Sequence, residues 1–200
     1  MGLAAQINKG IDVATYLASR GKVFYAADST AIETVTGQTS VATTTPTFLL
    51  QVPSGTTAIP LGCNLFQTGS VAGGLITVIM ELDNADRYAS GGTAETIFPA
   101  RTLGPSGATT APTSSCVLYS GATATDAYGV RIDAAKFIAE VTPTIGETVS
   151  GQTGAYIWTP SGGYSFLVGP AAWLVYTAAG TTGPTWLWNV KWAEVETVNL

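Results

Sequence analysis

The chain contains no histidine, and this absence excludes more chemistry than any other feature of its composition. The common serine and cysteine hydrolases use histidine to activate the nucleophile, and many metal sites use imidazole ligands. Catalysis by carboxylates alone or by lysine stays open. The commonest hydrolytic designs do not, and we predict a protein that is not an enzyme and that carries no cofactor.

Charged side chains are also scarce, at 10% of the 200 residues, whereas soluble domains average about 25%. The net charge is −5, and the eight lysines and arginines are scattered along the chain. Because a nucleic-acid-binding surface needs clustered cations to neutralise phosphates, we expect no direct contact with nucleic acid. So few charges suit a protein that buries much of its surface in an assembly. A threonine-rich β-domain without a partner is the alternative.

Cysteines and long apolar runs are few. The two cysteines, Cys63 and Cys116, lie in no CxxC motif, so nothing supports a zinc site. Both lie in strand-like segments, and we predict two buried free thiols, with a disulfide as the alternative. No apolar run approaches the roughly 18 residues that a transmembrane helix needs, so we expect no contact with a membrane.

From residue 22 onward, short strand-like segments alternate with turns rich in Gly, Ser, Thr and Pro. The pattern predicts strands over 22–26, 31–35, 47–52, 58–66, 75–82, 116–120, 128–132, 137–142, 155–159, 164–169, 173–177 and 186–195. Only the segment 133–141 is ambiguous, because its Ala, Lys and Glu also suit a helix. Short strands at this spacing indicate an all-β sandwich or barrel.

We predict one β-domain over 22–200, preceded by an arm or short helix over 1–21. Leu3, Ile7 and Ile11 recur every four residues in this arm, which is a weak amphipathic pattern. Residues 99–115 form a loop of Pro, Gly, Thr and Ser that is too long for a simple hairpin. We expect this loop to project from the domain or to lie against a partner.

Three of the five tryptophans lie within seven residues of one predicted strand. Alternate residues of a strand point to the same face, and the tryptophans share theirs: Trp186, Trp188 and Trp192. The opposite face carries the polar side chains of Asn189 and Lys191. This alternation favours a buried tryptophan face, in the core of one subunit or across a subunit boundary, and we group Trp173 with it. A platform that stacks sugars or bases is the alternative.

The densest group of polar side chains lies in "ELDNADRY", residues 81–88. Glu81, Asp83 and Asp86 supply the oxygen ligands that calcium prefers, which makes them weak candidates for a cation site. The EF-hand spacing is absent, and Asx side chains also start turns by bonding the nearby backbone. We therefore favour a structural turn.

Three stretches carry a family resemblance: 52–65, 76–93 and 169–196. They share a charge-poor composition rich in Gly, Thr and Ala, and the last holds a "GTTGP" hairpin and a Trp-Ala-Glu-Val close. In these features the chain resembles virion structural proteins of tailed bacteriophages, namely capsid decoration (cement) proteins and head-fibre bases. The resemblance implies a jelly-roll-like antiparallel β-sandwich that forms a homotrimer. It also implies contact with the major capsid protein on the capsid surface, after assembly in the host cytoplasm.

We therefore predict a non-enzymatic decoration protein that stabilises the capsid exterior. A jelly-roll shell protein of a small virus is one alternative. Such proteins often carry a basic arm that faces the genome, whereas residues 1–21 hold only Lys9 and Arg20, which favours an outer position.

Two functions outside the virion class would each depend on a different set of side chains. A carbohydrate-binding module would use exposed aromatic residues such as Trp158, Tyr164 or Trp173. A carboxylate glycosidase would need two facing acids, although no spacing joins any two of the available ones. Those acids are Glu33, Glu95, Asp126, Asp133 and Glu140.

Overall fold

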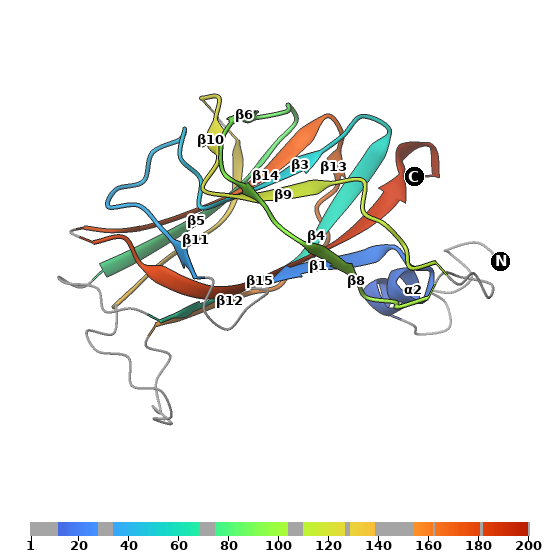
Figure 1. The fold of residues 1–200 in the computed structure, drawn as a ribbon, viewed down its shortest axis with the longest axis horizontal. Helices are drawn as coiled ribbons and strands as arrows, with labels where there is room; N and C mark the ends of the chain where they lie inside the picture. The colour runs from blue at the N-terminus through green and yellow to red at the C-terminus, as the bar shows by residue number, and fades with distance from the viewer. Residues whose placement is uncertain are drawn as a thin grey trace, which may run out of the picture.

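Two antiparallel sheets pack face to face as a β-sandwich in the computed structural model of the chain, as Figure 1 shows. The structure describes residues 12–27, 34–68, 75–103, 110–126, 129–138, 154–161, 163–180 and 182–199. The predicted all-β sandwich is confirmed.

The first sheet, which we call the β4/β15 sheet, has the order β12-β4-β15-β1-β8. Its strands are β12 (Ala155–Trp158), β4 (Thr56–Gln67), β15 (Thr185–Glu196), β1 (Val23–Ala27) and β8 (Ile97–Pro99). Two short strands extend it: β13 (Leu167–Val168) pairs with β4, and β2 (Val35–Thr36) pairs with β15.

The second sheet, the β5/β14 sheet, has the order β11-β5-β14-β3-β9-β7. Its strands are β11 (Val130–Ile138), β5 (Leu75–Asp83), β14 (Ala171–Ala179), β3 (Phe48–Val52), β9 (Val117–Ser120) and β7 (Thr93–Ala94). The strands β6 (Tyr88–Ser90) and β10 (Thr123–Ala124) form a separate pair.

The strand order is that of a jelly roll. Four adjacent strands of each sheet carry this order, and together they are β1, β3, β4, β5, β11, β12, β14 and β15. Numbered one to eight along the chain, they give the orders 1-8-3-6 in the β4/β15 sheet and 2-7-4-5 in the β5/β14 sheet. Most successive strands thus alternate between sheets, in the two interlocked Greek keys that define a jelly roll.

A short helix, α2 (Val13–Ser19), lies within the predicted arm; residues 1–11 fall outside the described part. Asp12 caps its first turn by accepting the Thr15 N–H at 3.1 Å. Its last turn closes as a Schellman motif, in which Gly21 N–H donates to Ala18 and Lys22 N–H to Leu17. Gly21 has a φ of 70°, which glycine adopts without strain, so the chain turns directly into β1.

Leu17 anchors α2 on the outer face of the β4/β15 sheet. It packs in a cluster with Val23, Ile59, Leu61 and Ala193, all of them buried. The helix covers one end of this face (Figure 1). The outer face of the β5/β14 sheet is partly covered by the β6–β10 pair, which explains why β14 is buried along its whole length.

The strand boundaries depart from the predictions in a few places. The ambiguous segment 133–141 belongs to β11 as far as Ile138, because pairing with β5 along its length outweighs the helix propensity of its residues. The strand predicted over 164–169 shortens to β13. The predictions over 31–33 and 139–142 lie outside the described residues, as does 104–109 of the long loop.

Candidate functional site

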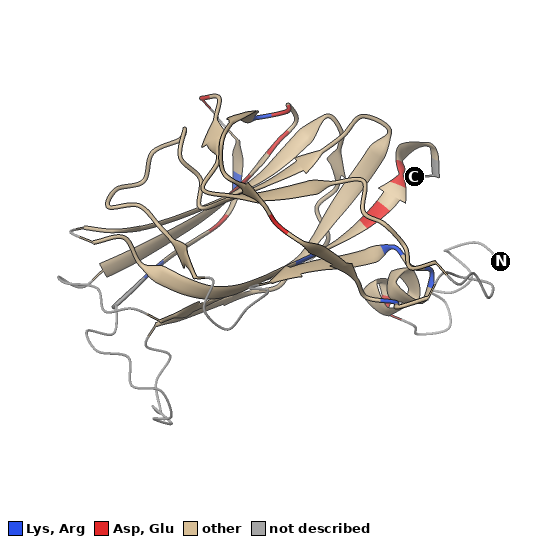
Figure 2. Ribbon diagram, viewed as in Figure 1, with Lys and Arg blue, Asp and Glu red and all other residues tan. Residues whose placement is uncertain are grey.

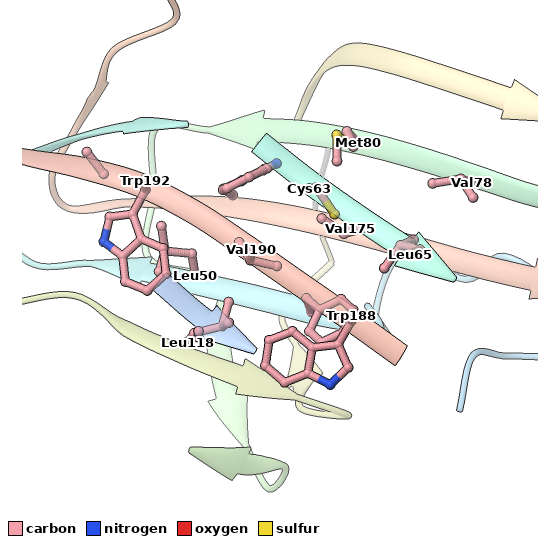
Figure 3. Packing of buried hydrophobic residues seen from close by; sticks show 14 of the residues in the cluster. Leu50, Cys63, Leu65, Val78, Met80, Leu118, Val175, Trp188, Val190 and Trp192 are labelled. Carbon is pink, nitrogen blue, oxygen red and sulfur yellow. The ribbon is translucent and has the colours of Figure 1, made fainter. Parts of the chain in front are cut away.

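The tryptophan face of β15 lies inside the sandwich of a single chain. Trp186 and Trp192 are fully buried, and Trp188 is 4% exposed. Across the core, the Trp188 ring lies 4.7 Å from the Phe48 ring of the opposite sheet. Trp173 on β14 is equally buried, and Figure 3 shows Trp188, Trp192 and Val190 pointing into the same apolar layer.

Two of the buried indoles are fixed by hydrogen bonds to polar side chains. Trp186 Nε1 donates to Thr177 Oγ1 at 3.0 Å, and that hydroxyl lies 2.8 Å from the Thr47 hydroxyl. Trp192 Nε1 donates to Glu194 Oε1 at 2.8 Å. Satisfying a buried indole N–H in this way fixes the ring orientation, which suits a structural core.

Glu194 accepts hydrogen bonds from several groups, and it is only 5% exposed. Besides Trp192, its carboxylate accepts the N–H of Ser115 at 2.8 Å, the N–H of Cys116 at 3.4 Å and the Ser114 hydroxyl. The carboxylate therefore fastens the end of the long 99–115 loop to β15. We call this group, Trp192, Glu194 and residues 114–116, the Glu194 clasp.

The Glu194 clasp was missed by sequence reasoning, although one signal was available. The parity that places Trp186, Trp188 and Trp192 inward also places Glu194 on the inward face. A buried carboxylate needs several donors. Nothing in the local sequence identifies residues 114–116 as those donors.

The cation candidates of residues 81–88 form a structural turn. Asp83 Oδ2 pairs with Arg87 at 2.9 Å, and its Oδ1 accepts the Ala85 N–H. Asp86 accepts the Gln51 amide at 2.7 Å and the N–H of Tyr88. Glu81 lies 3.5 Å from Arg131. No group of three or more metal-ligating side chains that could hold an ion occurs in the described ranges.

The glycosidase candidates are spread over separate elements. Asp133 accepts the Tyr156 hydroxyl, Asp126 accepts the Thr43 hydroxyl at 2.6 Å and Glu95 accepts the Ser120 hydroxyl. Glu33 and Glu140 lie outside the described residues. Burial raises the pKa of Tyr156, and the Asp133 carboxylate raises it further.

The proposed sugar-stacking aromatics do not form one exposed row. Trp173 lies in the core, and Trp158 is half-buried with its ring 5.8 Å from the Trp173 ring. Only Tyr164 is exposed, and its hydroxyl donates to Asp12 at 3.3 Å, beside α2. Because two of the three rings serve packing, this set offers no flat aromatic platform.

Two hollows of similar volume open on the surface. The first, of about 380 Å³, lies between the end of α2, the end of β15 and residues 110–115; its wall includes Arg20, Lys22 and Glu196. The second, of about 390 Å³, lies beside β13 and is mostly apolar, with Phe166 and Val168 on its wall. Among the described residues of the second wall, the one acid is Asp83, which is already paired with Arg87.

Both cysteines are free and buried, which confirms the prediction. Burial raises the pKa of both thiols, and Glu194 adds to the effect at Cys116.

We expect neither thiol of the native protein to react with a chromogenic disulfide reagent at pH 8, and both to react in guanidinium chloride. Because the thiols ionise only after unfolding, stability should fall as the pH rises above the ordinary thiol pKa of about 8.5. Fast labelling of the native protein would contradict this burial.

Comparisons with protein-family models, with curated proteins and with solved structures found no match to this chain. None of the helices in the described ranges is long and apolar enough to cross a membrane. The strand order alone defines the class of this protein, an antiparallel β-sandwich with jelly-roll strand order and one short N-terminal helix.

Proposed function

We propose that this chain is a non-enzymatic structural protein of a virion, a decoration protein that associates with copies of itself, as a trimer, and binds the capsid exterior. The observation that carries the proposal is that the candidate side chains are occupied in packing and in hydrogen bonds within the fold. The candidate site residues, from the tryptophans to Asp83, Asp86 and Glu194, are used to hold the fold together. What remains for function is a charge-poor outer surface.

Such a surface can stabilise a capsid without any chemistry. A protein that binds only the assembled shell shifts the assembly equilibrium toward the shell by mass action. The stabilisation grows with the concentration of the decoration protein and with the number of sites that it occupies. Rigid β-sandwiches suit this role because they lose little conformational entropy when they bind.

A shell protein of a small virus is the second candidate, and the jelly-roll strand order favours it. Jelly rolls form the shells of many viruses as well as lectin domains. The low count of cations in residues 1–21 favours the exterior position instead, because a shell subunit that contacts the genome needs a basic surface. The two candidates differ in what the pure protein does alone.

The test compares the protein alone with the protein added to empty capsids built from the major capsid protein of the same virus. We expect the pure protein to stay a small oligomer, to sediment with the capsids and to raise the temperature at which they dissociate. An unrelated acidic protein of similar size should stay in the supernatant. Closed particles formed by the pure protein would show the shell function instead, and a strict monomer that ignores capsids would remove both.

A further inference from the structure

Helix α2 covers only one end of the outer face of the β4/β15 sheet. The rest of this face is rich in exposed apolar side chains. In the register of the sheet, Leu187 on β15 lies opposite Phe66 on β4, and in the next outward row Ile157 on β12 lies opposite Asn64. Phe66 is 44% exposed and Ile157 59%. We call this surface the open face; its outward residues form three rows: Leu187, Phe66, Ala155; Ala27, Asn189, Asn64, Ile157; and Phe98, Tyr25, Lys191, Gly62.

We propose that the open face is a two-fold contact between two copies of this chain, packed sheet against sheet. Sheets pack face to face at about 10 Å inside a sandwich, and the same geometry is available between two sandwiches. The other end of this face already shows the behaviour, since α2 buries Leu17 against it.

Charge favours a second copy as the occupant. The chain carries a net charge of −5, so two copies repel each other unless they meet through a surface without carboxylates. None of the outward residues of the open face is acidic. Its one charge, Lys191, lies with Nζ 5.3 Å from the centre of the Tyr25 ring. Figure 2 shows the described acidic residues mainly on the opposite sheet and its loops, and at the end of β15.

The polar side chains at the centre of the open face are self-complementary. Asn64 and Asn189 lie directly opposite each other in the middle row, and both are half-buried. An amide both donates and accepts, so it can pair with the same amide of a second copy, which a carboxylate or an ammonium group cannot do. A two-fold contact brings a residue against its own copy only near the axis, so this row suits an axis that passes through its centre.

The size of the open face sets the strength of the contact. The three rows each cross three or four neighbouring strands and together cover about 15 by 20 Å, or roughly 300 Å². A stable interface buries roughly 800 Å² per partner. We therefore expect a weak dimer with a dissociation constant of about 0.1–1 mM in solution, which becomes effective where many copies lie side by side. The contact leaves the sheet edges and loops free for a trimer.

The first test measures sedimentation velocity of the pure protein from 10 µM to about 1 mM. We expect the mean mass to rise with concentration as pairs form through the open face, and the substitutions Phe66→Lys and Ile157→Lys each to weaken this association by about tenfold or more. The matched controls are Phe166→Lys and Val130→Lys, which replace similarly exposed apolar residues elsewhere and should leave the association unchanged. A mean mass that stays constant at every concentration, or an equal loss in the controls, would overturn the proposal.

The second test uses a charge that a two-fold contact would double. Asn64→Asp puts a carboxylate into the centre of the open face, so two copies would bring two like charges together. We expect the mean mass of this variant to stay constant with concentration at pH 7 and to rise with concentration again below about pH 4, where the carboxylate is protonated. Asn84→Asp, on an exposed turn, is the control. A mean mass of Asn64→Asp that still rises with concentration at pH 7, as for the unmodified protein, would exclude this face, whatever the capsid-binding experiment gives.

Discussion

Replacing Trp192 by alanine is expected to lower the free energy of unfolding by about 3–5 kcal/mol, because the side chain is fully buried and its loss leaves a large cavity. The ring lies 6.4 Å from the Phe24 ring, and its N–H donates to Glu194. Alanine therefore removes core contacts and one donor to a buried carboxylate. The measurement is chemical unfolding in urea, followed by tryptophan fluorescence and circular dichroism.

Two matched variants separate the causes. Trp192→Phe keeps most of the buried ring and loses the N–H bond, and it should cost about 1–2 kcal/mol. Tyr164→Ala, which removes an exposed aromatic ring, should change stability by less than about 1 kcal/mol. If Trp192→Ala is as stable as the unmodified protein, the ring does not pack as the structure describes.

Glu194→Leu is the second large effect, with an expected loss of about 3–5 kcal/mol. The leucine cannot accept a hydrogen bond, so the Ser115 N–H and the buried Trp192 N–H lose their acceptor. The damage should spread to the 110–116 segment, because the clasp is what joins it to β15. We expect urea unfolding to shift and amide hydrogen exchange in residues 110–116 to speed up.

The control for the clasp is Glu196→Leu, two residues farther along the same strand on the exposed surface. It should change the stability by less than about 1 kcal/mol and leave the hydrogen exchange of residues 110–116 as it was. Glu194→Gln keeps the shape and one acceptor oxygen, so its loss of unfolding free energy should fall between those of Glu194→Leu and Glu196→Leu. Equal effects of the substitutions at 194 and 196 would mean that charge alone, rather than the clasp, sets the stability.

Local patterns predicted most of the strands because burial on one face of a sheet imposes an alternation that is visible in the sequence. The alternation in 186–195 predicted a buried tryptophan face, and β15 buries it. The same logic left 133–141 ambiguous, because its composition also suits a helix, and pairing with β5 decides for a strand as far as Ile138. Short strands such as β6, β7, β8 and β10 were missed, because two or three residues carry no periodicity.

The candidate site separates what the sequence determines from what the tertiary structure decides. The sequence by itself determined the all-β class, the lack of histidine chemistry, the scarcity of charge and the inward set of tryptophans, since these follow from composition and from the two-residue period of a strand. Only the tertiary structure decided the jelly-roll strand order, the partners of Glu194 and the extent of the open face. Those features join residues as distant as Ser115 and Glu194, or Phe66 and Leu187. Such pairs depend on the free energy of the whole packed core, which no local segment of the chain carries.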